Sequence, residues 1–136
     1  MRLDVVFTPT GLLPGEVQGR VVFVIDILRA GTTICAALWH GARAVIPVAS
    51  TAEALRLAQT LGPEETLLAG ERSCERIPGF ALGNSPREMA PEVVRGKTVI
   101  MTTTNGTAAL LAVANASHAY LSGAANFSIS AARAHQ

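Results

Sequence analysis

Short apolar runs, separated by polar and glycine-containing segments, recur along the whole chain and predict strands that alternate with helices. The run Val21–Ile25 is unbroken and rich in β-branched residues, which is typical of a strand buried on both faces. We therefore expect Val21–Ile25 and Val99–Met101 to lie in interior strands. The predicted strands are Leu3–Phe7, Val21–Ile25, Ala44–Val48, Thr66–Ala69, Lys97–Thr102 and His118–Leu121.

Helical patterns occupy most of the segments between these strands. The segment from Thr51 to about Leu61 has apolar residues at helical spacing, and either Ser50 or Thr51 can cap its N-terminus. Prolines and glycines instead predict a loop over Thr8–Gly19 and irregular structure over Ser73–Pro86. The other predicted helices are Ile34–Trp39, Thr107–Ala114 and Asn126–Ala134.

The alternation of strands and helices favours an α/β fold with a mostly parallel sheet, right-handed crossovers and helices on both faces. Pro47 lacks the N–H that a central strand needs, so the strand that contains it is expected near an edge of the sheet. A length of 136 residues is typical of one domain, and we expect residues 1–136 to form a single α/β domain.

Composition narrows the function classes. Apolar residues make up 49% of the chain and charged residues 15%, which favours a packed core. The net charge is +1, Lys97 is the sole lysine, and aromatic residues are few, so nucleic-acid binding is not expected. No apolar run reaches membrane-spanning length, and Asp4 interrupts any signal-peptide core, so we expect a cytoplasmic protein. Cys35 and Cys74 lack metal-ligand spacing and are expected to be free thiols.

Polar side chains follow the strand Val21–Ile25 at the point where a helix begins. Ligands of open α/β sheets bind at the carboxyl ends of the strands, and a helix N-terminus there favours an anion. Asp26 could hold a divalent cation, while Arg29, Thr32 and Thr33 could hold a phosphate. The alternatives are that Asp26 caps the helix or braces a turn and that Arg29 pairs with an acidic neighbour.

A second polar cluster follows the predicted strand Lys97–Thr102. One threonine is enough to cap a helix, and a simple turn is the alternative interpretation, but this stretch holds five hydroxyl or amide residues within six positions. Small hydroxyls beside a helix N-terminus are suited to binding an oxyanion. The expected phosphate-binding residues here are Thr102, Thr103, Thr104, Asn105, Gly106 and Thr107.

Glu71 also follows a predicted strand and could meet Asp26 at the same edge of the sheet. Two carboxylates are what a hard cation such as Mg²⁺ requires, with waters and a substrate phosphate completing its shell. The alternative for Glu71 is a salt network with Arg72 in a loop. Asn84 and Ser85 have a simple interpretation as a turn followed by a helix cap.

Four motifs, DILRAGTTI, LLAGER, GFALGNSP and GKTVIMTTTNGT, occur in an order that resembles the 2-phosphosulfolactate phosphatase family, the ComB-like proteins of coenzyme M biosynthesis. The resemblance extends from about Leu12 to about Ser130. It implies a three-layer α/β/α fold and a Mg²⁺-dependent acid phosphatase that acts on 2-phosphosulfolactate, a small anionic ester. Family chains normally continue further, so the chain resembles the N-terminal part of a family member.

The resemblance implies Asp26, Arg29 and Glu71 as catalytic residues, with Asp26 and Glu71 holding the metal and Asn84 and Ser85 joining the phosphate-binding residues. The chain departs from the family at Ser73-Cys74, where further glycines are common, and at Ala81, where aspartate is common.

We hypothesise a phosphatase that uses a metal-activated water, because no second aspartate of a DxDxT pattern is present to support an aspartyl phosphate. The alternative is a catalytically inactive anion-binding or subunit-interface domain. A dinucleotide-binding domain is disfavoured because no G-x-G-x-x-G follows the strand. Self-association into a homo-oligomer is left open.

Overall fold

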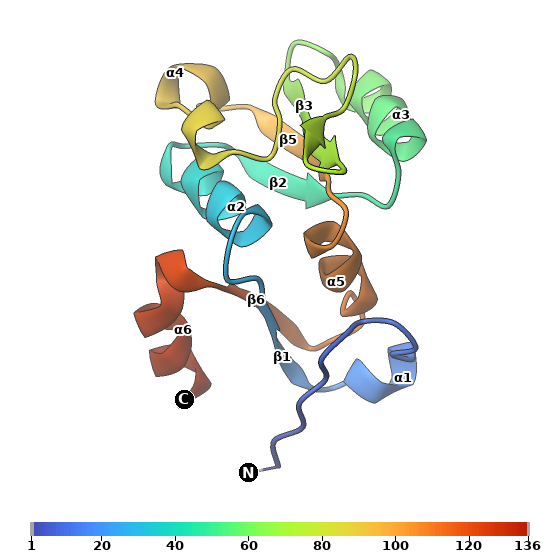
Figure 1. Cartoon of the computed structure of the whole chain (residues 1–136), viewed down its shortest axis with the longest axis vertical. Helices are drawn as coiled ribbons and strands as arrows, with labels where there is room; N and C mark the ends of the chain where they lie inside the picture. The colour runs from blue at the N-terminus through green and yellow to red at the C-terminus, as the bar shows by residue number, and fades with distance from the viewer. Residues whose placement is uncertain (1, 136) are drawn as a thin grey trace.

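The computed structural model describes residues 2–135, which adopt an α/β fold with a mostly parallel sheet (Figure 1). None of the helices described is long and apolar enough to cross a membrane. In chain order the elements are α1 (Pro14–Val17), β1 (Val21–Ile25), α2 (Ala30–Trp39), β2 (Ala44–Pro47), α3 (Thr51–Leu61), β3 (Thr66–Arg72), β4 (Glu75–Arg76), the 3₁₀ helix η1 (Pro86–Glu88), α4 (Pro91–Val94), β5 (Thr98–Thr102), α5 (Gly106–Ala112), β6 (His118–Ser122), the 3₁₀ helix η2 (Ala124–Asn126) and α6 (Phe127–Ala134).

The larger sheet has the strand order β2-β5-β3-β4. Strands β2, β5 and β3 are parallel, and β4 returns antiparallel to β3 in a short hairpin. Strand β5 is buried along its whole length, which confirms the prediction that Val99–Met101 is interior. Strand β2, which contains Pro47, lies at the edge of this sheet, as its missing N–H predicts.

Among residues 2–135, strand β1 pairs with β6 alone, in a separate parallel two-stranded sheet. Val24 packs in a small core, but Val21 and Ile25 are 57% and 69% exposed. The prediction that Val21–Ile25 is an interior strand buried on both faces is therefore wrong. A continuous apolar run indicates that both faces of a strand can be buried. It does not indicate whether the described part of the chain has helices or strands that cover each face.

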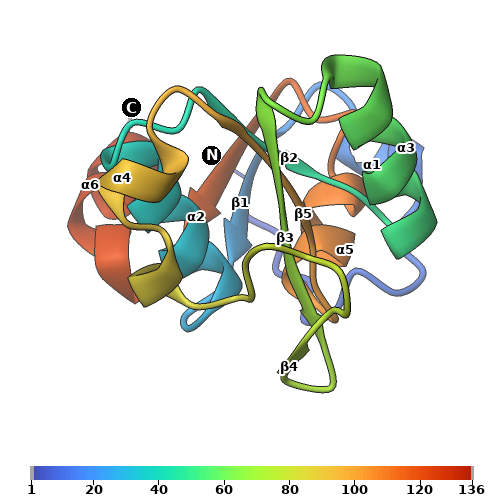
Figure 2. The ribbon, with the colours of Figure 1, turned by 90° about the horizontal axis from the view of Figure 1, so that it is seen from above.

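Two helical layers cover the larger sheet, with α2 and α4 on one side and α3 on the other (Figure 2). Because side chains alternate along a strand, Val99 and Met101 pack with Ile34 of α2. Ile100 faces the opposite way and packs with Ala54 of α3. The expected three-layer α/β/α arrangement is thus built around β5.

Helix starts reflect local capping. Ser50 caps α3 as predicted, since its Oγ accepts a hydrogen bond from Glu53 N at 3.1 Å. Ser85 occupies the N-cap position of η1, but its side chain makes no capping hydrogen bond. Helix α2 begins at Ala30, four residues earlier than predicted, because the two threonines near its start are tolerated inside the first turn.

Several segments differ from the sequence prediction. The segment Leu3–Phe7 forms no strand and is exposed, so that prediction is wrong. Strand β3 continues to Arg72, three residues beyond the predicted end, and the irregular segment Ser73–Pro86 contains β4. The short helices α1 and α4 were not predicted, because each spans four residues and is too short to show helical periodicity.

Candidate active site at the ends of β1, β3 and β5

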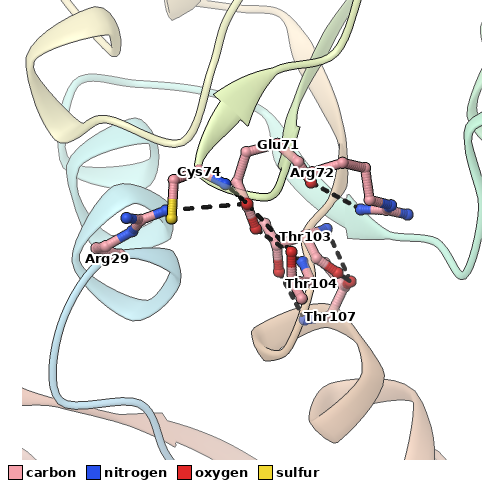
Figure 3. Close-up of polar contacts among 7 residues, drawn as sticks. All are labelled: Arg29, Glu71, Arg72, Cys74, Thr103, Thr104 and Thr107. Atoms are coloured by element: carbon pink, nitrogen blue, oxygen red, sulfur yellow. Dashed lines mark hydrogen bonds and ion pairs between the residues drawn. The ribbon is translucent and has the colours of Figure 1, made fainter.

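Glu71 lies inside β3 and is 5% exposed. Its Oε1 accepts a hydrogen bond from Thr104 N at 2.8 Å, and its Oε2 accepts bonds from Thr104 Oγ1 at 3.1 Å and Cys74 N at 2.9 Å (Figure 3). One buried carboxylate therefore joins the β3–β4 hairpin to the turn that follows β5. The alternative, a salt network between the Glu71 and Arg72 side chains, is not found, since Arg72 donates to the backbone carbonyl of Glu71 and forms no ion pair with its carboxylate.

The surroundings of Glu71 favour its charged form. Burial alone would raise the pKa of this carboxyl, but the backbone hydrogen bonds from Thr104 and Cys74, the Thr104 hydroxyl and the charge of Arg29 outweigh burial and hold the pKa below its ordinary value. Glu71 is therefore an anion at neutral pH.

Arg29 occupies the N-cap position of α2 with a positive φ of 77°. Its Nη2 lies 3.9 Å from Glu71 Oε2, so the interpretation that Arg29 pairs with an acidic neighbour is confirmed. The other non-glycine residues described with a positive φ are Ser73 and Cys74, in the hairpin turn beside the same carboxylate. Strained backbone of this kind is often concentrated at functional sites.

Asp26 immediately follows β1, and small residues surround it closely. A Cβ added to Gly31 would lie 2.8 Å from Asp26 O, and a Cβ added to Gly106 would lie 2.9 Å from Asp26 Oδ2. Asp26 Oδ1 is buried and has no hydrogen-bond partner. The alternative that Asp26 caps α2 through a side-chain hydrogen bond is therefore wrong. A buried carboxylate oxygen without a partner is rare, and a bound ion is one explanation for it.

Gly106 connects Asp26 to the threonine-rich turn. The same added Cβ that would lie 2.9 Å from Asp26 Oδ2 would also lie 3.5 Å from Thr103 Oγ1. Asp26 and Glu71 therefore flank one turn, with Asp26 beside Gly106 and Glu71 bonded to Thr104. Helices α2 and α5 follow strands of two different sheets, so the expected shared sheet edge does not account for this proximity.

Most threonine hydroxyls in this turn already have partners. Thr103 and Thr107 bond reciprocally, since Thr107 N donates to Thr103 Oγ1 at 3.1 Å and Thr103 N donates to Thr107 Oγ1 at 3.0 Å. The Thr104 hydroxyl donates to Glu71, and Thr102 Oγ1 accepts from Arg72. The interpretation of a threonine as the N-cap residue is wrong, because Asn105 occupies that position, but Thr103 Oγ1 still accepts a hydrogen bond from the first turn of α5. Within the described residues the Thr103 hydroxyl only accepts, so its hydrogen is available to a ligand.

The remaining predicted phosphate-binding residues differ in their surroundings. Thr33 is fully buried and its Oγ1 lacks a partner, whereas Thr32 is half-buried. Asn105 is the N-cap residue of α5, without a side-chain capping bond. No hydrogen bond in residues 2–135 joins Asn84 or Ser85 to Glu71 or to the threonine turn, although Asn84 Oδ1 is also buried without a partner.

Arg72 was not among the predicted site residues. It follows Glu71 in the motif LLAGER, so its position beside a candidate carboxylate was a usable signal. Its side chain is exposed and contributes to the lining of a cavity of ≈ 230 Å³ beside the threonine turn. The cavity is lined by Ala49, Arg72, Thr103, Thr104, Thr107, Ala108 and Leu111.

The carboxylates present are suited to Mg²⁺ but not to a protein-only metal cage. The part of the chain described contains no cluster of three or more His, Cys, Asp or Glu residues. Mg²⁺ commonly takes only one or two protein carboxylates and completes its shell with water and substrate phosphate. Asp26 Oδ1 has no partner, and Glu71 Oε1 accepts one bond and retains a lone pair. The donor chemistry of each residue is therefore compatible with Mg²⁺, and a metal shared by the two stays a prediction.

The fold and the site define an α/β protein with two carboxylates and a guanidinium group around a hydroxyl-rich turn. A family model described as "2-phosphosulpholactate phosphatase" matches residues 6–136, so the chain belongs to the 2-phosphosulfolactate phosphatase family.

Curated relatives agree with this assignment. A protein of Caldanaerobacter subterraneus subsp. tengcongensis is 49% identical over 106 residues, covering 78% of this chain and 44% of the relative. A protein of Symbiobacterium thermophilum is 45% identical, and the match covers 82% of this chain and 48% of the relative. A protein of Clostridium perfringens is 46% identical, and the match covers 81% of this chain and 45% of the relative. All three are named "Probable 2-phosphosulfolactate phosphatase". The chain thus spans slightly less than half the length of these relatives.

Proposed function

We propose that the chain provides the phosphate- and metal-binding part of a cytoplasmic, Mg²⁺-dependent phosphatase that converts 2-phosphosulfolactate to sulfolactate and phosphate. The observation that carries this proposal is the buried, unpartnered Oδ1 of Asp26, in a carboxylate whose other oxygen lies beside Gly106 and the threonine turn. Family membership supports the reaction class, and the names of the relatives supply the substrate.

Asp26 and Glu71 would hold the metal, which would neutralise phosphate charge and lower the pKa of a bound water. Asp26 supplies a carboxylate oxygen that no other group of the described chain occupies. Glu71 acts mainly as an organising residue, because three hydrogen bonds already fix its orientation. Its remaining lone pair on Oε1 is available to the metal or to one of its waters.

The phosphate would be held by Arg29 and by donors around the threonine turn. The Arg29 guanidinium is about half exposed, so it can bond a phosphate oxygen while it remains near Glu71. The Thr103 hydroxyl can donate its hydrogen because it only accepts within the chain. The first turn of α2 adds backbone N–H groups beside Asp26. These groups would align the phosphorus for attack by water on the face opposite the leaving oxygen.

A phosphate-release assay tests the proposal directly. The chain is incubated with 2-phosphosulfolactate and with a panel of simple phosphate monoesters, each with Mg²⁺ and with a chelator. We expect Mg²⁺-dependent release that is fastest with 2-phosphosulfolactate. The full-length relative from Caldanaerobacter serves as the control for assay conditions. Equal rates of phosphate release with and without the chelator would refute the requirement for Mg²⁺. Turnover by the relative but not by this chain would refute the proposal that this chain is itself active.

A catalytically inactive anion-binding or subunit-interface domain is the second candidate. It is favoured by the exposure of large apolar side chains on β1 and α6, namely Val21, Ile25, Phe127 and Ile129. Such side chains are typical of surfaces that contact another protein segment or subunit. Phosphate binding without turnover, combined with self-association in sedimentation experiments, would support this candidate over the enzyme.

A further inference from the structure

Arg72 is held in one orientation by two neutral acceptors. Its Nη1 donates to Glu71 O at 2.8 Å, and its Nη2 donates to Thr102 Oγ1 at 2.8 Å. A guanidinium group has five N–H donors, so three are still available. Arg72 itself is exposed, but both acceptors have fixed positions, because Thr102 is fully buried and Glu71 belongs to the sheet.

Arg72 has no carboxylate within ion-pair distance in residues 2–135, although Glu75 lies opposite it in the β3–β4 register. Among the ion pairs of residues 2–135, Arg29 pairs with Glu71, but none includes Arg72. The lining of the cavity beside Arg72 contains threonine, alanine and leucine and no acidic residue. The cavity therefore presents the positive charge of Arg72 beside a lining that is otherwise neutral.

The two arginines occupy different sides of the site. In Figure 3 the Arg29 side chain points toward Glu71, whereas the Arg72 side chain extends away from it on the other side. Thr104 connects the two regions, because its hydroxyl bonds Glu71 while the residue also lines the cavity. A substrate with two acidic groups can therefore place one near Arg29 and the other near Arg72.

We propose that Arg72 and this cavity bind the second acidic group of the substrate, a carboxylate or sulfonate that does not react. This inference rests on the proposed phosphatase function and assigns Arg72 to substrate selection. The phosphate lies on the Asp26 and Arg29 side of the threonine turn, and the second oxyanion accepts hydrogen bonds from the free N–H groups of Arg72. The apolar part of the lining, Ala49, Ala108 and Leu111, surrounds the carbon chain between the two groups.

The test compares Arg72→Gln with the parent chain on phosphate esters that carry two, one or no acidic groups besides the phosphate. These are 2-phosphosulfolactate, 2-phospholactate with a carboxylate alone, 2-phosphoethanesulfonate with a sulfonate alone, and ethyl phosphate with neither. Charge-assisted hydrogen bonds predict a loss of kcat/KM of about 10- to 100-fold on substrates with a bound second acid, mainly through KM. Ethyl phosphate should change by less than about 3-fold, and the single-acid esters reveal whether carboxylate or sulfonate is bound.

Binding measurements separate this inference from the proposed function. Calorimetric titrations of sulfolactate and of inorganic phosphate need no turnover. Arg72→Gln should weaken sulfolactate binding by about 10-fold or more and leave phosphate binding nearly unchanged. Absence of turnover in the parent, with this selective loss still seen, would refute the phosphatase but support the role of Arg72. No sulfolactate binding by the parent, or equal losses for both anions, would overturn the inference.

Two further variants control for structure. Arg76 is an exposed arginine of the same hairpin and does not line the cavity. Arg76→Gln should therefore change the binding of neither sulfolactate nor phosphate. Ala108→Leu fills the cavity without altering Arg72 and should reproduce the selective loss. Unfolding transitions of all variants show whether the fold is retained. If Ala108→Leu binds sulfolactate as the parent does, the second acid does not bind in this cavity.

Discussion

Glu71 and Thr104 are joined by two hydrogen bonds, one from the Thr104 backbone N–H to Oε1 at 2.8 Å and one from the Thr104 hydroxyl to Oε2 at 3.1 Å. These bonds connect the end of β3 to the turn after β5. The positions of Arg29 and Cys74 depend on the same carboxylate. The geometry of the site therefore depends on one buried acidic residue.

Replacement of Glu71 by glutamine should lower the free energy of unfolding by about 2 kcal/mol or more. The amide nitrogen cannot accept a hydrogen bond, so at least one donor among Thr104 and Cys74 loses its partner. Urea unfolding measures the change. Glu75→Gln, an exposed neighbour in the same hairpin, is the matched control and should change stability by less than about 0.5 kcal/mol. Equal effects of the two substitutions would show that the Glu71 network contributes little.

The free energy of unfolding should depend on pH in a way that reflects the lowered pKa of Glu71. Its pKa is lower in the folded chain than in the unfolded chain, so its contribution is complete above the unfolded value of about 4.3 and is lost as pH falls through the folded pKa. The difference in unfolding free energy between the parent and Glu71→Gln should therefore be constant near pH 7 and shrink below about pH 4. Asp4 and Glu65, whose pKa values are also lowered by arginines, are common to both proteins and cancel. A constant difference down to pH 2–3 would contradict this assignment.

The sequence predicted the large sheet well because its signals are local. Apolar runs and glycine or proline breaks identified β2, β3, β5 and most of the helices, and Pro47 correctly indicated an edge strand. The same signals failed for β1. Its apolar character is compatible with an interior strand, but pairing partners and sheet membership depend on contacts distant in sequence, which one sequence does not reveal.

The candidate site was predictable in its residue types and less so in its contacts. Asp26, Arg29 and Glu71 follow or end strands, and the structure places Arg29 near Glu71. The reciprocal bonds between Thr103 and Thr107 were not foreseen, because hydroxyl-rich turns look alike whether their hydroxyls bind a ligand or the backbone. The neighbouring Glu71 was a signal for Arg72, but only the fold shows which side of the strand this terminal residue faces.

Gly106 should be intolerant of a side chain. A Cβ at this position would lie 2.5 Å from Ala30 Cβ and 2.9 Å from Asp26 Oδ2, so α2 and α5 would have to separate. Gly106→Ala should lower the free energy of unfolding by about 1–3 kcal/mol. Thermal or urea unfolding measures this effect. Gly15→Ala is the control, because a Cβ there meets nothing within 4 Å and should leave stability nearly unchanged. Unchanged stability in Gly106→Ala would mean that the two helices can move apart freely.

Phosphate affinity should depend more on Arg29 than on Thr103. Arg29→Ala removes a charged donor, which should cost about 1.5–3 kcal/mol of phosphate binding, whereas Thr103→Val removes one neutral hydroxyl, which should cost about 0.5–1.5 kcal/mol. Calorimetric titration of inorganic phosphate into each variant gives the order. Thr103→Val should also lower stability by about 1 kcal/mol, since Thr107 N loses its acceptor. Equal phosphate affinity in Arg29→Ala and the parent would show that Arg29 serves only the ion pair with Glu71.

Mg²⁺ should stabilise the folded chain through Asp26. A ligand that binds only the folded state raises the free energy of unfolding by about 2.7 kcal/mol at 100 times its dissociation constant. Asp26→Asn should abolish this increase together with Mg²⁺-dependent turnover. In the absence of Mg²⁺ the variant should be about as stable as the parent, because Asp26 Oδ1 makes no hydrogen bond that could be lost.

Asp4→Asn is the matched control for the Mg²⁺ experiment, because Asp4 is the other aspartate of the chain and its carboxylate pairs with Arg20 at the surface. It should retain the full response to Mg²⁺ in urea unfolding. Equal stabilisation of Asp26→Asn and the parent would exclude Asp26 as a metal ligand. The unpartnered oxygen would then have to be explained by the close packing of Gly31 and Gly106 around this carboxylate.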